Sequence, residues 1–328
     1  MSTDIQTIFT FDTEYSADSV EWYCDENIFA VGTYQLTEND ENTKSIRKGR
    51  IYLFKFDASD QKVEKLQQIE SDAVLDQKWF KDDLITATSL GNVEVYNFKN
   101  SGLEQRSKIS LDSSSDCLAL SIDIDPINNK ILASDSYGQL TLIDKSSEKT
   151  LLQWKCHEYE AWTCAFDNWN HNIVYSGGDD SLLNVWDLRD CSNEMTNKVL
   201  SKRRDAGVTS FLNHKENLLF VGSYDENLCL YDVRNFKRNL DEINLNGGIW
   251  RIKKSPHDEN LLLIACMYHN FSVIDYSEKL SIVGEYNEHK SICYGCDWSH
   301  HQHENFKFFA TCSFYDHRLS VCSFTYDK

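Results

Sequence analysis

Proline, glycine and basic residues are scarce in this chain of 328 residues. It contains 2 prolines, 13 glycines, and 33 lysines and arginines against 52 aspartates and glutamates. So little proline and glycine, with 12% aromatic residues, excludes a disordered or collagen-like chain. The formal net charge of −19 disfavours nucleic acid and anionic membranes as partners, because both carry negative charge. It favours a cationic partner, or it serves solubility alone.

Long apolar segments are also lacking. No apolar run approaches the ~18 residues of a transmembrane helix, and the first twelve residues have neither the basic nor the apolar region of a signal peptide. The 11 cysteines are odd in number and scattered, as expected for reduced thiols in the cytosol. We therefore expect a cytoplasmic, monomeric protein with no membrane partner.

Motifs for metals, cofactors and catalytic nucleophiles are weak or missing. Cys293 and Cys296 have C-x-x-C spacing, but without a second pair we interpret them as buried thiols. His300, His301 and His303 are interpreted as a solvated loop. There is no G-x-S-x-G elbow, no S-x-x-K and no H-E-x-x-H motif. We expect no metal and no cofactor, and a hydrolase built this way would use water activated by a carboxylate or an imidazole.

One segment, Val174–Arg189 (VYSGGDDSLLNVWDLR), shows how the chain is organised. It predicts a strand over 174–177, a tight turn over Gly178–Asp180 and a second strand over 182–187. Small residues, a turn aspartate and a terminal Trp-Asp pair are typical of one blade of a WD-type β-propeller. We expect Asp180 to be linked through His157 and a serine hydroxyl to the indole of Trp186.

The same pattern recurs along the chain. Asp225 lies 45 residues after Asp180 in a matching segment, further copies end at Asp144 and Asp275, and the last copy carries Asp316. With a weaker copy ending at Asn97 and one split by a polar hairpin loop over 36–49, this makes seven units at a spacing of roughly 40–50 residues. The sequence therefore predicts an all-β, seven-bladed WD40-type β-propeller that occupies residues 1–328 as a single domain.

The first and last units predict how the ring closes. The last unit supplies only three strands, over 292–298, 307–313 and 318–324, whereas residues 5–11 alternate like a strand ahead of the first unit. We expect this N-terminal strand to join the outer edge of the last blade. For blades two to five we place the limits at 73–98, 116–145, 157–189 and 204–235, with 190–196 as a polar connection.

A candidate site is expected on one face of the ring, where the loops before the innermost strands meet the tight turns. Trp162, Trp250 and Tyr294 occupy the same position in their blades, and Tyr224 and Tyr315 lie in turns of the same face. Aromatic rings beside carboxylates attract a quaternary ammonium, at about 0.5–2 kcal/mol per ring. The alternative is that these aromatic residues only plug the channel or pack between blades.

Several segments, taken in order, resemble the diphthine methyl ester hydrolase family, the WD-repeat enzymes of diphthamide synthesis. The likeness covers nearly the whole chain and is weakest in blades two and three. Its specific parts are G-G-x-W-R-I and A-T-C-S-F-Y-D-H. The segments that carry it are ADSVEW (17–22), AVGTYQL (30–36), GRIYL (49–53), EAW (160–162), YSGGDD (175–180), GSYDE (222–226), GGIWRI (247–252), ACM (265–267), YGCDW (294–298) and ATCSFYDH (310–317).

The resemblance implies an enzyme that removes the methyl ester from methylated diphthine, a modified histidine of translation elongation factor 2. Diphthine carries a trimethylammonium group, which would suit the expected aromatic site. In our hypothesis Trp162, Trp250 and Tyr315 form a cage, and Tyr224 and Tyr294 help to bind the substrate. Glu160 and Asp179 hold the ammonium or activate water, while Arg251 or His317 stabilises the oxyanion.

A second class of function stays open. Trp186–Arg189 and Tyr231–Arg234 resemble the W-D-x-R motif of substrate receptors for cullin-type ubiquitin ligases. A non-enzymatic adaptor or a trafficking scaffold would use the same fold, because fold alone does not determine function. Turnover of a methylated diphthine substrate by the pure protein would distinguish the esterase from the adaptor.

Overall fold

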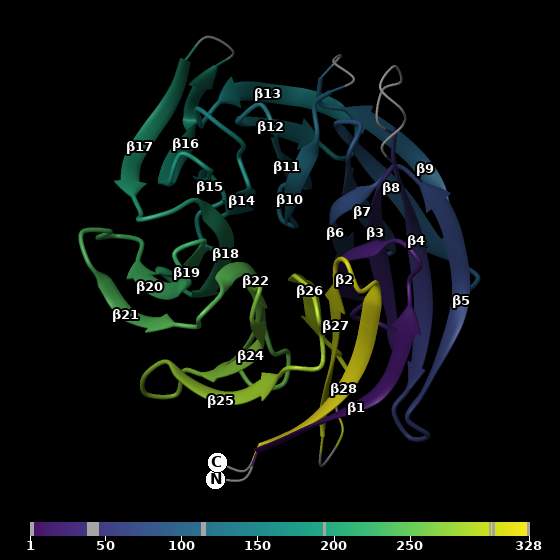
Figure 1. Cartoon of the computed structure of the whole chain (residues 1–328). Coiled ribbons are helices and arrows are strands. Elements are labelled where there is room, and N and C mark those ends of the chain that lie inside the picture. Colours follow the sequence, from purple (N-terminus) through teal and green to yellow (C-terminus); the bar gives the residue numbers. More distant parts are fainter. Residues whose placement is uncertain are drawn as a thin grey trace.

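The computed structural model describes residues 3–37, 46–112, 116–192, 195–301, 303 and 306–326. Within these residues the strands form seven four-stranded antiparallel sheets, arranged as the blades of a ring around a central channel (Figure 1). The prediction of a seven-bladed propeller is confirmed. Each blade packs its faces on its two neighbours, which lets a chain of this length stay well packed without one large core.

The strands of the first four blades follow one another in the sequence. Blade one contains β2 (Ser16–Trp22), β3 (Ile28–Thr37), β4 (Ile46–Asp57) and β5 (Lys62–Ser71). Blade two contains β6 (Val74–Phe80), β7 (Asp83–Thr88), β8 (Asn92–Lys99) and β9 (Gly102–Ser110). Blade three contains β10 (Ala119–Asp125), β11 (Lys130–Asp135), β12 (Gln139–Asp144) and β13 (Lys149–Lys155). Blade four contains β14 (Thr163–Phe166), β15 (Ile173–Gly177), β16 (Leu182–Ser192) and β17 (Met195–Arg203).

The last three blades include the one that joins both ends of the chain. Blade five contains β18 (Val208–Lys215), β19 (Leu218–Ser223), β20 (Asn227–Asp232) and β21 (Asn239–Asn244). Blade six contains β22 (Gly248–Lys254), β23 (Leu261–Met267), β24 (Asn270–Asp275) and β25 (Ser281–Tyr286). Blade seven contains β26 (Cys293–Trp298), β27 (Lys307–Ser313), β28 (Arg318–Tyr326) and, as its outermost strand, β1 (Thr3–Asp12).

Strand β1 closes the ring as predicted. It pairs antiparallel with β28, from Thr3 opposite Tyr326 to Asp12 opposite Arg318. The two chain ends therefore lie side by side at the same edge of the molecule (Figure 1). The pairing satisfies the outer edge of β28, which would otherwise present unpaired backbone groups.

The limits predicted for blades two to five were too short. In each of these blades the structure adds an outermost strand beyond the predicted end, namely β9, β13, β17 and β21. The segment 190–196 is not a connection between blades, because β16 and β17 pair with each other and form a hairpin there. These outer strands have one face toward solvent, so their sequences are largely polar and lack a strong apolar alternation.

Blade four contains the predicted hydrogen-bonded link between its strands. His157 Nδ1 lies 2.9 Å from Asp180 Oδ1, and its Nε2 lies 2.8 Å from Ser176 Oγ. Trp186 Nε1 donates to the same serine oxygen at 2.9 Å. Gly178 permits this arrangement, since a Cβ on it would lie 2.5 Å from His157 Cγ.

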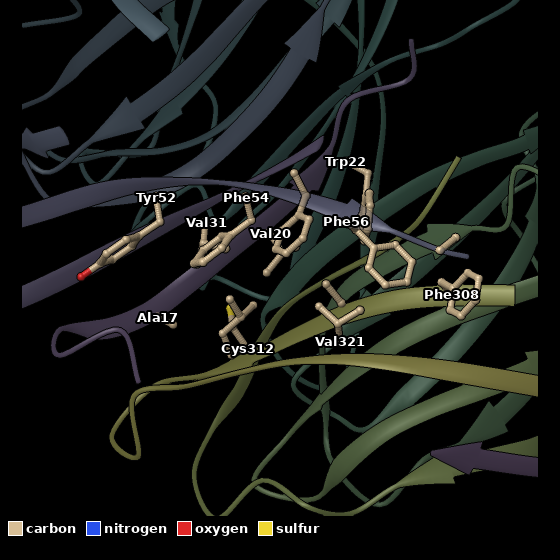
Figure 2. Packing of buried hydrophobic residues seen from close by; sticks show 14 residues of the cluster. Ala17, Val20, Trp22, Val31, Tyr52, Phe54, Phe56, Phe308, Cys312 and Val321 are labelled. Carbon is tan, nitrogen blue, oxygen red and sulfur yellow. The ribbon is translucent and has the colours of Figure 1, made fainter. Parts of the chain in front are cut away.

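The interface between the first and last blades is rich in aromatic side chains. Trp22 and Phe29 have ring centroids 4.6 Å apart, and Phe56 meets Phe308 at 4.9 Å across the two blades. Figure 2 shows the rings of Trp22, Phe56 and Phe308 near Val321 and other apolar side chains of both blades. Burial of such side chains contributes roughly 1.5–3 kcal/mol each. This packing fixes the first blade, and with it the start of β2, against the last one.

Candidate functional site

The innermost strands share a local feature on one face of the ring. In six of them the register with the next strand shifts near the N-terminal end, which leaves one extra residue, as in a β-bulge. In blade four, Trp162 stands directly before β14 at the matching position. The extra residues of the other blades are Asp18, Leu75, Leu120, Thr209, Trp250 and Tyr294.

These positions surround a pocket of about 870 Å³ at the mouth of the channel. All of them except Thr209 line it, and Thr209 instead hydrogen bonds to the carbonyl of Ile249. The volume lies within the range of roughly 300–1,000 Å³ found for small-molecule sites. The remaining lining comes mainly from β3, β4 and the turns of the same face, and includes Ser16, Tyr34, Gln35, Leu36, Arg47, Leu118, Ser136, Glu160, Tyr224, Phe314, Tyr315 and His317.

A continuous belt of aromatic rings forms one wall of this pocket. Trp162 and Trp250 have centroids 5.7 Å apart at an interplanar angle of 63°. Trp250 lies 4.9 Å from Tyr294 and 6.2 Å from Tyr224. The belt continues from Tyr294 to Phe314 at 5.3 Å. The structure thus brings together four of the aromatic residues that the sequence indicated, on a single face.

The two predicted carboxylates occupy different places. Glu160 is half-buried and lines the pocket. Asp179 is exposed and lies outside the lining, but its Oδ1 accepts a hydrogen bond from Trp162 Nε1 at 3.0 Å. The backbone N–H of Asp179 also donates to the carbonyl of Glu160 at 2.9 Å. This arrangement lets Asp179 orient the indole of Trp162.

The remaining predicted residues are divided between the pocket and the channel beneath it. His317 lines the pocket, and Tyr315 lies at its rim with 71% of its surface exposed. Tyr315 touches Phe314, at 5.0 Å, rather than the tryptophans, so the cage closest to Trp162 and Trp250 is completed by Tyr224 and Tyr294. Arg251 faces the channel instead, where its Nη2 lies 3.0 Å from Asp76 Oδ1 and donates to the carbonyl of Leu75 at 3.0 Å.

Sequence reasoning missed Asp18, Phe314 and Arg47. Asp18 lies on β2, is only 4% exposed and lines the pocket, and its Oδ1 has no hydrogen-bond partner among the described residues. Arg47, on β4, reaches the same pocket and donates from Nε to the hydroxyl of Tyr34 at 3.1 Å. Strand β3 continues to Thr37 and strand β4 begins at Ile46, so both strands enter the segment predicted as a loop. Residues 38–45 of that segment lie outside the described residues.

Burial dominates the electrostatics of the pocket floor. Burial raises the pKa of Asp18, Arg251 acts in the opposite direction and the nearby carboxylate of Asp76 adds to the rise, so that the resulting pKa is about 8. Burial also raises the pKa values of Tyr224 and Tyr294. The phenols therefore stay neutral, and the floor presents a carboxyl group that is mostly protonated at neutral pH.

Charged side chains continue below the floor along the channel. Lys253 of β22 pairs with Glu21 and lies 3.7 Å from Asp297, and Lys78 of β6 lies 2.7 Å from Asp123. With the pair of Arg251 and Asp76, these contacts connect innermost strands of five blades. They hold the strands that carry the bulge residues.

Cysteines and metal ligands do not form a second site in the described part of the chain. The ten cysteines whose side chains are described are free, and Cys293 and Cys296 are buried. Within the same residues no group of three or more His, Cys, Asp or Glu side chains could hold a metal ion. Nor do these residues contain a helix of the length and apolarity that a membrane crossing requires.

Fold and site together define a WD40-type propeller with an aromatic-walled pocket at one mouth of its channel. A solved chain in the crystal structure of the mitotic checkpoint complex shares the fold, with a TM-score of 0.74 and 15% identity over 98% of this chain and 92% of that one. No protein-family model matches the sequence.

Curated relatives identify the family. The diphthine methyltransferase homolog of Dictyostelium discoideum is 37% identical, with 94% of this chain and 96% of that protein covered. The diphthine methyltransferase of Homo sapiens is 34% identical over 88% of this chain and 74% of its own length, and that of Schizosaccharomyces pombe is 32% identical over 93% and 96%. The chain belongs to the diphthine methyltransferase family.

Proposed function

We propose that this protein acts in diphthamide biosynthesis by hydrolysing the methyl ester of methylated diphthine on translation elongation factor 2. The products are diphthine, with a free carboxylate, and methanol. The observation that carries the proposal is the aromatic pocket of Trp162, Tyr224, Trp250 and Tyr294, with carboxyl groups beside it. Family membership supports the same substrate.

The pocket suits the trimethylammonium of diphthine. Ring faces attract a quaternary cation without a hydrogen bond, and the attraction grows where water is excluded. Glu160 adds negative charge to the lining, and Asp179 orients Trp162. The ester is attached to the same modified side chain as the ammonium, so binding of the cation would bring it over the pocket floor.

Hydrolysis, rather than methyl transfer, is the direction that the pocket chemistry favours. A methyl ester needs water as its only other reactant, and a carboxyl group can activate that water. The tetrahedral intermediate carries a negative charge on the former carbonyl oxygen. Arg47 and His317 both line the pocket and carry side chains that can donate hydrogen bonds to that oxygen.

The rim offers a surface for a protein substrate. Leu36, Ile46, Tyr159, Tyr268 and Tyr315 are all exposed apolar side chains of the hairpin and turns around the pocket. Such side chains surrounding a pocket are typical of protein contact surfaces. The net charge of −19 would favour a cationic partner, and the buried free thiols are consistent with the cytosol.

The decisive experiment measures methanol release from elongation factor 2 carrying methylated diphthine. We expect the pure protein to release methanol without any added methyl donor and to leave the diphthine carboxylate on the factor. Incorporation of methyl groups from a labelled donor, with no methanol release, would instead show transfer. Tight binding with neither reaction would support the adaptor. Full activity in both Glu160→Gln and Asp179→Leu would remove the roles proposed for these carboxylates.

A further inference from the structure

Asp18 is the carboxylic acid on the floor of the aromatic pocket. Of the six extra residues at the bulges, Asp18 alone is acidic. The matching positions of the two preceding blades in the ring are aromatic, with Trp250 in blade six and Tyr294 in blade seven. Its side chain is almost fully buried and lines the pocket, while its Oδ1 has no partner among the described residues. A buried carboxyl oxygen without a partner is costly, so its presence calls for an explanation, and a ligand in the pocket would supply one.

The neighbours of Asp18 do not neutralise it. Arg251 of β22 is directed to Asp76 of β6, with 3.0 Å between Nη2 and Oδ1. Asp76 also accepts hydrogen bonds from Ser121 Oγ and from the backbone N–H of Ile122 at 3.0 and 2.9 Å. The other titratable groups that interact with Asp18 are the Tyr294 phenol and the Cys312 thiol, both neutral because burial raises their pKa values.

We propose that a quaternary ammonium bound in the aromatic pocket ionises Asp18, and that the carboxylate so formed is the general base of ester hydrolysis. The first half concerns binding alone, and the second half rests on the proposed function. The pocket residues that would hold the cation, Trp162, Trp250 and Tyr294, lie in the same lining as Asp18. A positive charge within ~4–6 Å lowers the pKa of a carboxyl group by about 1–3.

The consequence is a base that becomes active only with its substrate. In the empty pocket, burial raises the pKa of Asp18 to about 8, so the group is mostly protonated at neutral pH. Binding of the cation lowers this pKa and releases the proton to solvent. The pocket would therefore hydrolyse an ester attached to a quaternary ammonium and spare esters that lack one.

The chemical step balances without another reactant. The Asp18 carboxylate takes a proton from water, and the water oxygen bonds to the ester carbonyl carbon. The tetrahedral intermediate then breaks its bond to the methoxy oxygen, which takes the proton back from Asp18 and leaves as methanol. The product is a carboxylic acid that loses its own proton to solvent.

Choline and its uncharged isostere 3,3-dimethylbutan-1-ol test the binding half on the wild-type protein. Quenching of tryptophan fluorescence, measured between pH 6 and 9, gives the affinity for each. Because bound choline favours the ionised form, we expect its affinity to rise by about tenfold from pH 6 to pH 8 and then to level off. The isostere should show no such rise. Choline affinity independent of pH in the wild type, or no choline binding, would overturn the proposal.

Two variants assign the effect to Asp18. Asp18→Asn keeps the size of the side chain and should bind choline weakly, with no dependence on pH. Glu160→Gln removes a different carboxylate from the same pocket, so its affinity for choline can fall but the rise between pH 6 and 8 should remain. Retention of the full rise in Asp18→Asn would refute the assignment. Thermal melts of both variants establish that they fold.

The catalytic half is tested by methanol release with the same proteins. We expect Asp18→Asn to lower kcat by roughly 10²–10⁴-fold, with activity partly restored in Asp18→Glu. An unchanged kcat in Asp18→Asn would overturn the catalytic half. The proposed function would still stand in that case, provided that the wild type releases methanol. If the wild type releases no methanol, the proposed function and the catalytic half both fail, and the choline titration still decides whether Asp18 responds to a bound cation.

Discussion

Asp179 illustrates how a residue outside the pocket can determine what the pocket binds. Its carboxylate is exposed, yet it accepts the indole N–H of Trp162 at 3.0 Å and so fixes one ring of the aromatic wall. A hydrogen bond of this kind contributes about 1 kcal/mol net. Its loss should therefore be felt as a weaker substrate complex rather than as a slower chemical step.

Substitutions at Asp179 separate orientation from charge. Asp179→Asn keeps an acceptor oxygen for Trp162, whereas Asp179→Leu removes it. If orientation is the role, we expect Leu to raise KM by roughly fivefold with kcat unchanged and Asn to have little effect. If the negative charge attracts the ammonium directly, both variants should raise KM equally. Steady-state methanol release measures both constants.

A Trp162→Phe background provides the matched control. The phenyl ring keeps an aromatic face but has no N–H to donate, so the difference between Asp179→Leu and Asp179→Asn should disappear in it. A difference that persists in this background would show that Asp179 acts on something other than the indole.

At the residue scale, the sequence indicates the aromatic wall but not the acid on the floor. Trp162, Trp250 and Tyr294 stand out because large aromatic residues at equivalent positions of a repeat are not needed for packing. Asp18 occupies the equivalent position in blade one, but a single aspartate after an alanine gives no such signal. Only the ring closure places it beside residues more than 140 positions away, and only the bulge directs it into the pocket.

Among the structural elements, the hydrogen-bonded link in blade four is the one whose residues the sequence predicts. Asp180 accepts from the backbone N–H groups of Glu158 and Leu182, at 3.0 and 3.1 Å, in addition to its contact with His157. Although burial alone would raise it, the pKa of Asp180 is held below its ordinary value by these hydrogen bonds and by His157. The carboxylate therefore stabilises the fold in its ionised form.

Asp180→Ala should destabilise the protein markedly at neutral pH. The substitution leaves the His157 ring and the backbone N–H groups of Glu158 and Leu182 without their shared partner. We expect this to lower the free energy of unfolding by about 2–4 kcal/mol. Because the folded pKa is lowered, the contribution is fully present above the ordinary pKa near 4 and is lost as the pH falls through the folded value. The difference between wild type and variant, measured by urea unfolding, should thus shrink below about pH 4.

Arg234→Ala is the control for this element. Arg234 pairs with Asp232 at 2.6 Å in blade five, at the opposite end of β20, the strand equivalent to β16, but its side chain is mostly exposed. Surface ion pairs contribute little, so we expect almost no change in unfolding. If Arg234→Ala lowered the free energy of unfolding as much as Asp180→Ala does, both ends of the strand would contribute equally to stability. That result would contradict the special role given to the buried link.

The outer strands are the elements that are hardest to predict from the sequence. β9 and β13 alternate weakly, since one face of each meets only solvent or polar side chains, and their burial patterns show few buried positions. The inner strands are nearly continuously buried, as in β23 and β24, and their apolar runs are plain in the sequence. Four-stranded blades are thus inferred from the spacing of the repeats more securely than from each strand.

At the scale of the whole molecule, the ring can be predicted because each blade depends mainly on its neighbours. Local repeats then determine the number of blades, and the missing strand of the last blade determines where the N-terminus goes. The ion pairs between Lys253, Glu21 and Asp297, on the channel side of the innermost strands, are not predictable in this way. They join strands of three neighbouring blades, of which β2 is far from β22 and β26 in the sequence, and no repeat marks them.

Ring closure by β1 leads to a prediction about the whole fold. Deleting residues 1–12 would expose the outer edge of β28, a strand that is mostly buried, together with the apolar surface that Ile5, Phe9 and Phe11 cover. We expect a loss of several kcal/mol, which corresponds to a melting temperature lower by roughly 10 °C, and aggregation through the open edge. Calorimetry and light scattering measure these effects.

A circular permutant distinguishes pairing of the edge from interlocking of the two chain ends. Thr3 lies opposite Tyr326, so a short glycine-serine linker can join the ends, and new ends can be opened between β9 and β10. This chain keeps β1 on β28 but no longer has a blade built from both ends. If edge pairing stabilises the ring, the permutant should melt within a few degrees of the wild type. A permutant that melts as low as the deletion variant would show that the interlocked ends, and not the satisfied edge, hold the seven blades together.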